Sequence, residues 1–405
     1  MKLTGFASPM RHDIDPAFSE KRTAPLNEII SHYVICRQPG RYIGWPTIAE
    51  AVNGDLLVVF SGDRDAHVDP FGKTMLVRST DNGRTWGEAE TVNDTPLDDR
   101  DAGICIAADG SVLVSWFTSH YVTDAYMNFC PNGCSPDVRP RWRARIEGVR
   151  RADLAQWAST ETDGSGRYEL GRFIRRSTDH GRTWQPPVRV IPTAPHGPCL
   201  LSDSRLCFVG TGPHIGRERG EMYLATAESR DHGQTWRDVG RINASPPYRG
   251  CESDGWAYLT EPHVVETSPD CLLMMARYEE SPRRSGGCRL WQAVSEDNGE
   301  TWTEPAETPI LGKPPHLIRL RDGRILVTYG YRHAPFGQRA CLSADGGRTW
   351  DYEHEIVLRD DAPSGDLGYP ASLEMKDGTI LTVYYQQEHK GEKPCLMATH
   401  WKSGS

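Results

Sequence analysis

Residues 79–86 read STDNGRTW, and the same eight-letter pattern returns four more times along the 405-residue chain. The other copies are STDHGRTW at 177–184, SRDHGQTW at 229–236, SEDNGETW at 295–302 and SADGGRTW at 343–350. The Asp at the third position accepts hydrogen bonds from amides just downstream, and the Gly at the fifth position permits the positive φ of a tight turn. The Thr and Trp that follow suit a strand that packs a large ring. Each copy therefore predicts a turn that leads into a strand, and the repeat belongs to the scaffold.

Short apolar runs broken by turn residues lie between the copies, as in PTIAEAVNGDLLVVF at 46–60 and PHLIRLRDGRILVTYG at 315–330. The copies start 98, 52, 66 and 48 residues apart. Four short strands in every ~40–50 residues are typical of a propeller blade. We therefore predict an all-β fold, a six-bladed β-propeller with four-stranded antiparallel blades, from about Arg41 to Trp401.

The repeat also divides the chain into a single propeller, residues 27–405, and an N-terminal extension, residues 1–26. The sixth blade lacks a fourth strand of its own, and the β-rich stretch 27–37 is expected to supply it and close the ring. The 98-residue interval predicts an insertion at 120–168 in the second blade, which includes the Arg-rich run RPRWRARIEGVRRADLAQW. We expect this insertion to cover the site or to contact another subunit of a homo-oligomer.

Composition narrows the setting of the protein. The formal net charge of -9 argues against a nucleic-acid partner. The sequence has no run that predicts a membrane span, and its start lacks the apolar core of a secretory signal. The number of cysteines is odd, at eleven, and five of them fall in predicted strands, which favours a reducing cytoplasm. These five are Cys105, Cys199, Cys207, Cys271 and Cys341. Cys130 and Cys134 form a CPNGC pair that reads as an ordinary loop, so no metal or other cofactor is expected.

The eight-letter repeat resembles the Asp box, or BNR repeat, of the sialidase (neuraminidase) superfamily, and the resemblance covers nearly all of the chain after Asn27. It implies a glycoside hydrolase whose site lies at the end of the central channel opposite the Asp boxes. The family's sites combine a Tyr nucleophile, a Glu that assists it, an Asp acid/base and three Arg that hold the substrate carboxylate. A neutral Tyr suits an anionic sugar because the two do not repel each other.

The resemblance implies that the nucleophile is Tyr369 and that the Glu that assists it is Glu261. Both lie at the predicted start of the first strand of a blade. Tyr369 in DLGYPASLEMKDG opens the last blade, where the family has its Tyr. Glu261 and Arg277 in the fourth blade are 16 residues apart, as the family's Glu and Arg are. A Glu beside a Tyr hydroxyl can accept its proton, which otherwise leaves only near pH 10. Each of these residues could instead be a packing or rim residue.

The acid/base is expected in the first blade's loop SGDRDAHVDPFG at 61–72. Arg64 and Asp69 have the family's spacing, and Asp63 and Asp65 are rivals for the acid role. Asp65 is also a candidate for substrate binding.

The third arginine is expected in YRHAPFGQRACLS of the fifth blade, as Arg339 or its rival Arg332. The first is missing, because Gly44 in RYIGWPTI stands where the family has Arg. Arg41 comes three residues too early to replace it. Trp45 offers a ring that could stack on a sugar, so the chain is a divergent member for which sialic acid is a doubtful substrate.

The histidines of the chain are a second departure from the sialidase pattern. His263 follows Glu261 by two residues and so shares its strand face, and His316 opens the fifth blade. His196, His67 and His333 fall at other predicted mouth positions. Such histidines could serve a lyase or a rhamnosidase-like enzyme that acts on uronate glycans, or could hold a metal.

We conclude from the sequence that the protein is a retaining glycosidase that cleaves a terminal, acidic sugar. Tyr369 is the expected nucleophile, Glu261 its base and Asp69 the acid/base, with His263 as a further catalytic candidate. The expected substrate-binding residues are Arg64, Arg277, Arg339, Arg332, Trp45, His316 and Asp65. A carbohydrate is the expected partner. The alternatives are the histidine-dependent lyase and a propeller that binds glycans without catalysis.

Overall fold

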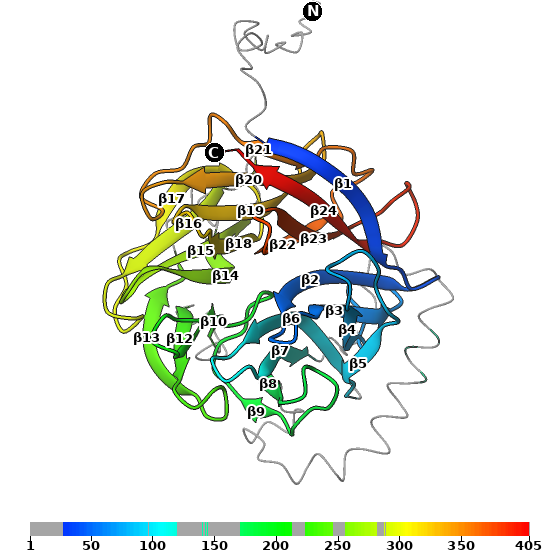
Figure 1. Cartoon of the computed structure of the whole chain (residues 1–405), viewed down its shortest axis with the longest axis horizontal. Coiled ribbons are helices and arrows are strands. Elements are labelled where there is room, and N and C mark those ends of the chain that lie inside the picture. The colour runs from blue at the N-terminus through cyan, green and yellow to red at the C-terminus, as the bar shows by residue number, and fades with distance from the viewer. Residues whose placement is uncertain are drawn as a thin grey trace, which may run out of the picture.

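The computed structural model describes residues 27–95, 97–119, 140, 142, 144, 171–212, 223–245, 256–281, 287 and 289–404. Its strands form six four-stranded antiparallel sheets that surround a central axis like the blades of a propeller (Figure 1). The predicted fold class is therefore confirmed. Among the described residues, no helix is long and apolar enough to cross a membrane.

Each of the first three blades runs from the axis outward in chain order. The first contains β2 (Tyr42–Glu50), β3 (Leu56–Arg64), β4 (Lys73–Ser79) and β5 (Glu90–Asn93). The second contains β6 (Asp98–Ile106), β7 (Val112–Ser119), β8 (Gly171–Ser177) and β9 (Val188–Arg189). The third contains β10 (Cys199–Leu200), β11 (Leu206–Thr211), β12 (Tyr223–Ser229) and β13 (Arg237–Asn243).

The fourth and fifth blades repeat this order, whereas the sixth takes its outer strand from the other end of the chain. The fourth contains β14 (Trp256–Ser268), β15 (Cys271–Ser281), β16 (Arg289–Ser295) and β17 (Ala306–Leu311). The fifth contains β18 (Pro315–Arg319), β19 (Ile325–Tyr331), β20 (Gly337–Ser343) and β21 (Ile356–Arg359). The sixth contains β22 (Gly368–Glu374), β23 (Ile380–Gln386), β24 (Cys395–Ser403) and the N-terminal β1 (Asn27–Cys36).

The ring closes where β1 pairs antiparallel with β24, so that Asn27 lies opposite Ser403 and Tyr33 opposite Ala398. Figure 1 shows the blue first strand beside the red last strand. This pairing covers the edge that β24 would otherwise expose. Because the first and last strands belong to one sheet, the ends of the described chain stabilise each other.

The Asp-box turns follow the third strand of five blades and share one hydrogen-bond pattern. In the first copy, the Asp81 carboxylate accepts from the Thr85 amide at 2.8 Å and from the Thr85 hydroxyl at 2.6 Å. The Ser79 hydroxyl donates to Asp81 at 2.8 Å and accepts from the Gly83 amide at 2.8 Å. Gly83 has a φ of 83°, the left-handed conformation that the sequence predicted for it.

The hydrophobic core is divided among the blade interfaces. Leu57 and Val59 of the first blade pack in one cluster with Ile104 and Val114 of the second, and the Asp-box Trp184 covers this cluster. The Asp-box turn thus anchors its strand by a ring at a blade interface. A third strand runs in the same direction as the first strand of its blade, so the Asp boxes lie at the opposite end of the channel from the first-strand starts.

Candidate active site

Four first strands each contain, in their N-terminal half, a residue other than glycine with a left-handed backbone. Trp45, Asp101, Glu261 and Tyr369 have φ values of 58°, 57°, 49° and 51°. Each lies at a β-bulge, since the pairing of β2, β6, β14 and β22 with the next strand shifts at these positions. A bulge adds a residue and redirects its side chain. Left-handed backbone is costly for Trp and Tyr, and such strain collects at functional sites.

Two of these bulged residues meet across the channel. The Tyr369 hydroxyl donates a hydrogen bond of 2.6 Å to Glu261 Oε1. Arg277 Nη1 donates to Glu261 Oε2 at 2.7 Å and to the Tyr369 oxygen at 3.3 Å. The structure thus brings together the three residues that the sequence placed in blades four and six. The phenol oxygen has a proton acceptor on one side and a cation on the other.

Burial and charge shape this triad further. Burial, followed by the Glu261 charge, raises the pKa of Tyr369 well above its ordinary value, so the resting phenol is neutral. Arg277 is also bonded to Glu279 through Nε at 2.6 Å, and Lys313 donates to Glu279 at 2.7 Å. Glu261, Arg277, Glu279 and Lys313 therefore form a chain of alternating carboxylates and cations that starts at the hydroxyl, and each of the two cations has a carboxylate partner.

Residues 152–382 match the BNR repeat-like domain family, and this match covers more than half of the chain. The chain belongs to that family. Its fold is that of a BNR propeller of the sialidase superfamily. The sialidase of Bacteroides fragilis is 25% identical over 381 residues, which are 84% of this chain and 59% of that protein. The sialidase of Micromonospora viridifaciens is 26% identical over 369 residues, 84% of this chain and 49% of that protein. The BNR propeller thus spans about half to three fifths of these relatives.

Solved structures share the propeller at low sequence identity. A protein of unknown function from Dyadobacter fermentans superposes with a TM-score of 0.70 at 22% identity, covering 94% of this chain and all of that one. The NanB sialidase of Streptococcus pneumoniae superposes with a TM-score of 0.59 at 15% identity, covering 96% of this chain and 72% of that one. These likenesses show the fold alone.

Asp101 is the residue of this mouth that the sequence reasoning missed. Burial raises its pKa to about 7, and the nearby Glu261 charge adds to the shift. Asp101 occupies the bulged position of β6 that corresponds to Tyr369 in β22, and its charge contributes to the raised pKa of Tyr369. A signal was available, because RDAGI at 100–104 aligns with GWPTI at 44–48, TEPHV at 260–264 and GYPAS at 368–372. In each segment the second letter is the bulged residue.

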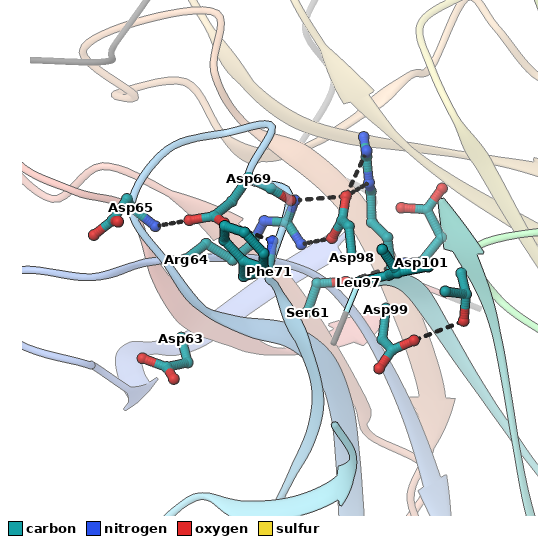
Figure 2. A network of polar contacts seen from close by, with 12 residues as sticks. Ser61, Asp63, Arg64, Asp65, Asp69, Phe71, Leu97, Asp98, Asp99 and Asp101 are labelled. Carbon is teal, nitrogen blue, oxygen red and sulfur yellow. Dashed lines mark hydrogen bonds and ion pairs between the residues drawn. The ribbon is translucent and has the colours of Figure 1, made fainter. Parts of the chain in front are cut away.

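Asp69, the predicted acid/base, lies within its own loop. Its carboxylate accepts from the Phe71 amide at 2.8 Å and from the Asp65 amide, and the residue is 1% exposed. Figure 2 shows Asp69 among these loop residues, with Asp101 on the other side of Arg64. In the described part of the chain, no hydrogen bond or ion pair joins Asp69 to the triad. A buried carboxylate whose two oxygens accept hydrogen bonds from the amides of its own loop is poorly placed to protonate a substrate.

Arg64 and Asp65 also serve the first-blade loop. Arg64 is fully buried and donates to Asp98 at 2.6 Å and to the Asp69 carbonyl at 3.2 Å (Figure 2). The side chain of Asp65 accepts from Arg41 and, at 3.0 Å, from Trp142 Nε1. Apart from Arg64 Nε, which is buried without a partner, the side-chain polar groups of these two predicted substrate-binding residues are bonded to neighbouring residues. The contact with Trp142 shows that one residue of the predicted insertion reaches this loop.

The fifth blade resolves the choice between its two arginines. Arg339 is 4% exposed and donates to the carbonyls of Gln338, at 3.2 Å, and Arg359. Arg332 instead lies with its guanidinium carbon 5.7 Å from the centre of the Tyr369 ring, and its Nη2 is buried without a partner. The rival is therefore the arginine that the structure brings to the nucleophile.

Trp45 forms a wall of the mouth. It is 2% exposed, and its ring lies edge-on to Tyr369 at 6.2 Å and to His67 at 5.1 Å between ring centres. Arg41 does not replace the missing arginine, because it is bonded to Asp63 at 2.9 Å. The Trp45 ring is packed edge-on by its neighbours and is not an open platform for a sugar.

Three buried histidines line the channel below this mouth. His263 and His316 stack with ring centres 4.4 Å apart, and His196 meets them edge-on at 5.6 and 4.9 Å. The Leu317 amide donates to His263 Nδ1 at 2.9 Å, and the Ser372 amide to His316 Nδ1 at 3.3 Å.

An amide can only donate, so in the neutral rings of His263 and His316 the proton must be on Nε2. Burial lowers the pKa of His263 to about 3, so this ring is neutral. Burial and the nearby His263 also hold the pKa of His316 well below its ordinary value. Neither ring offers a lone pair as a lyase base or as a metal ligand. This observation disfavours the predicted catalytic role of His263 and the substrate-binding role of His316.

The remaining candidates lie elsewhere. Among the described residues, the one cluster spaced to hold a metal is the exposed group Glu388, His389 and Glu392 on the loop after β23. His333 packs beside Tyr331, with ring centres 5.5 Å apart. Cys130, Cys134 and most of the predicted insertion are outside the described residues.

Proposed function

We propose that this propeller is a retaining glycosidase that removes a terminal sugar through a covalent bond to Tyr369. The observation that carries the proposal is the 2.6 Å hydrogen bond from the Tyr369 hydroxyl to Glu261, with Arg277 at 3.3 Å from the same oxygen. The similarity to two sialidases supports glycosidase chemistry. A phenol with a base and a cation on its oxygen is an activated nucleophile.

The first step forms the bond between the Tyr369 oxygen and the anomeric carbon while the glycosidic bond breaks. Glu261 accepts the phenol proton, and Arg277 offsets the negative charge that develops on the oxygen. The leaving oxygen takes a proton from an acid on the opposite side. In the second step, water attacks the anomeric carbon while the bond from this carbon to the Tyr369 oxygen breaks. The same acid residue, now ionised, removes the water proton, and Glu261 returns a proton to the Tyr369 oxygen.

We assign the acid/base role to Asp101 in place of the predicted Asp69. A pKa of about 7 keeps the carboxyl partly protonated at neutral pH, which a proton donor requires. In the described structure its carboxylate makes no recorded hydrogen bond, in contrast to both oxygens of Asp69. The group is therefore available to a leaving oxygen.

The test combines product stereochemistry with covalent trapping. Aryl glycosides of several sugars are offered to the purified protein, and the anomer released first is read by proton NMR. A fluorinated glycosyl fluoride of the cleaved sugar should then add one sugar mass to the peptide that contains Tyr369. Release of the inverted anomer, or an unlabelled Tyr369 during turnover, would contradict the proposal, and binding without turnover would indicate the glycan-binding alternative.

A further inference from the structure

The wall of the mouth around Gly44 is occupied by two tyrosines. A Cβ atom on Gly44 would lie 3.4 Å from the Tyr385 ring and 3.5 Å from the Tyr42 ring. These rings fill the place into which a longer side chain at this position would extend. The missing arginine is thus not replaced by empty space, because aromatic side chains with polar ends stand there.

The polar ends converge on one carboxylate oxygen. Asp366 Oδ1 accepts from the Tyr42 hydroxyl at 2.7 Å, from the Tyr385 hydroxyl at 3.1 Å and from His67 Nδ1 at 3.1 Å. Burial alone would raise the pKa of Asp366, but the hydrogen bonds and the His67 contact outweigh it and lower this pKa. Asp366 is therefore an anion fixed in orientation by three neighbours.

The opposite sides of this cluster face outward. No hydrogen bond to Asp366 Oδ2 or to His67 Nε2 is recorded among the described residues, and the two side chains are 33% and 42% exposed. With His67 Nδ1 directed at Asp366, the pair presents one carboxylate oxygen and one ring nitrogen to solvent. Such a combination suits neighbouring sugar hydroxyls, each of which both donates and accepts.

We propose that Asp366 and His67 form a hydroxyl-binding subsite for the terminal sugar, and that this sugar presents a neutral edge, not a carboxylate, to the Gly44 wall. The inference rests on the proposed glycosidase function and specifies its substrate class. The subsite is one ring away from the nucleophile, since Trp45 packs on both His67 and Tyr369, at 5.1 and 6.2 Å. The pair and Tyr369 therefore border the same part of the mouth, on either side of Trp45.

The charges around the mouth favour the same substrate class. Arg277 and Lys313 share Glu279, and Arg64 is paired with Asp98. Arg332 keeps an unpartnered Nη2, but it lies at the Tyr369 ring, and no hydrogen bond or ion pair joins it to Asp366 in the described part of the chain. A carboxylate at the Gly44 wall would meet the Asp366 anion in the place where the family has a cation. This reasoning replaces the acidic sugar expected from the sequence by a neutral one.

The experiment uses pairs of aryl glycosides that differ only in a hydroxymethyl or a carboxylate group, namely glucoside with glucuronide and galactoside with galacturonide, in both anomers. Wild type should prefer the hydroxymethyl member at least ~100-fold in kcat/KM. Asp366→Asn should raise KM for that member at least ~10-fold with a smaller change in kcat, as expected for a positioning residue. His67→Gln, at the more exposed side chain of the pair, is a second variant that keeps the Tyr42 and Tyr385 bonds to Asp366.

Binding is measured in parallel by saturation-transfer NMR with the corresponding methyl glycosides, so that failure of catalysis and failure of the subsite are distinguishable. Preference for neutral members, weakened by Asp366→Asn and His67→Gln, supports the subsite even when nothing is cleaved. Tighter binding or faster cleavage of the acids overturns it. Binding of no neutral member, or unchanged behaviour in both folded variants, overturns it as well.

Discussion

The two ends of the channel use left-handed backbone for opposite purposes. At the Asp-box end, Asn82 and His232 have φ values of 62° and 59°, and each precedes a glycine. At the mouth, Glu261 and Tyr369 have nearly the same dihedral angle, but no glycine follows them. The Asp-box conformation is stabilised within eight residues by side-chain acceptors of the same turn. The mouth conformation is held by contacts between blades.

The difference shows which left-handed residues can be predicted from the sequence and which cannot. A turn whose amides are bonded by its own side chains can be predicted from consecutive residues, and five copies of the same eight residues make the Asp-box turn easy to identify. Glu261 is fixed by Tyr369, which lies 108 residues away along the chain. Backbone strain that depends on distant residues is offset by the surrounding structure, and it persists where the strained residue has a functional role.

The largest effect is expected at the nucleophile. Tyr369→Phe keeps the ring that packs against Trp45 but removes the oxygen that Glu261 and Arg277 hold. We expect kcat to fall by about 10³-fold or more, because the covalent route is lost, while Tm stays near the wild-type value. Turnover is measured on the substrate found in the aryl glycoside panel.

His263→Ala is the matched comparison, since this ring lies below the mouth and its Nδ1 accepts from a backbone amide. We expect it to lower Tm and to reduce kcat far less than Tyr369→Phe does. A well-folded Tyr369→Phe protein with near-normal turnover would refute the assigned mechanism. The reverse order of the two variants would revive the histidine-dependent lyase.

The next largest effect separates the two aspartates. Asp101→Asn should reduce kcat/KM by about 10²–10⁴-fold on substrates with poor leaving groups and much less on activated aryl glycosides. With its pKa raised to about 7, Asp101 is protonated below that pH, so wild-type activity should decline as pH rises through about 7. This alkaline limb should vanish in Asp101→Asn.

Asp69→Asn supplies the control, because its carboxylate serves the loop amides. It should lower Tm and leave the pH profile unchanged. If the alkaline limb disappears in Asp69→Asn and persists in Asp101→Asn, the acid/base is the residue that the sequence predicted and our reassignment is wrong.

The fold could be predicted from the sequence because its signals are local and repeated. The Asp boxes, the turn residues and the blade period gave six blades of four strands, and β1 lies beside β24 in the sixth. In the site, Tyr369, Glu261 and Arg277 were found because family spacing survives in their strands. Asp101 was missed because it follows two other acids and an Arg in DDRDAG, where nothing within the segment itself shows which carboxylate enters the channel.

The assignments that did not reach the mouth share one cause. Arg64 and Arg339 have suitable spacing along the chain, but Arg64 binds an Asp of the next blade through both Nη atoms, and Arg339 donates to backbone carbonyls. Whether an arginine is free depends on tertiary partners that no spacing records. The Asp366 cluster likewise joins Tyr42, His67 and Tyr385, which are far apart in sequence.

At the Asp-box end a substitution should change stability without changing chemistry. Asp297 accepts from the Ser295 hydroxyl at 2.7 Å and from the Thr301 amide at 2.9 Å, and these bonds help to lower its pKa. Asp297→Ala should lower Tm at pH 7 by roughly 2–4 °C, about the effect of losing ~1 kcal/mol of stability. The kinetic constants should not change, since this end of the channel is far from the triad.

The pH dependence of that loss identifies its origin. A carboxyl whose folded-state pKa is lowered contributes stability above its unfolded pKa of ~3.9, and the contribution is lost as pH falls further. The gap in Tm between wild type and Asp297→Ala should therefore shrink below about pH 4. A gap that stays constant down to pH 2.5 would assign the loss to packing and not to the ionised turn.

The smallest effect is expected at His232, the fourth residue of the third Asp box. His232 has a φ of 59°, and its Nδ1 is buried without a partner, whereas the fifth copy has Gly346 at the equivalent place with a φ of 73°. Glycine relieves the ~1–2 kcal/mol cost of left-handed backbone but adds roughly 0.5–1 kcal/mol of unfolded-state entropy. The Arg176 bond to the His232 carbonyl is retained because it uses backbone. His232→Gly should therefore shift Tm by no more than about 2 °C and leave turnover unchanged, measured by thermal denaturation and by the same aryl glycoside assay. A large loss of stability would show that this turn, like the channel mouth, depends on contacts from outside its own eight residues.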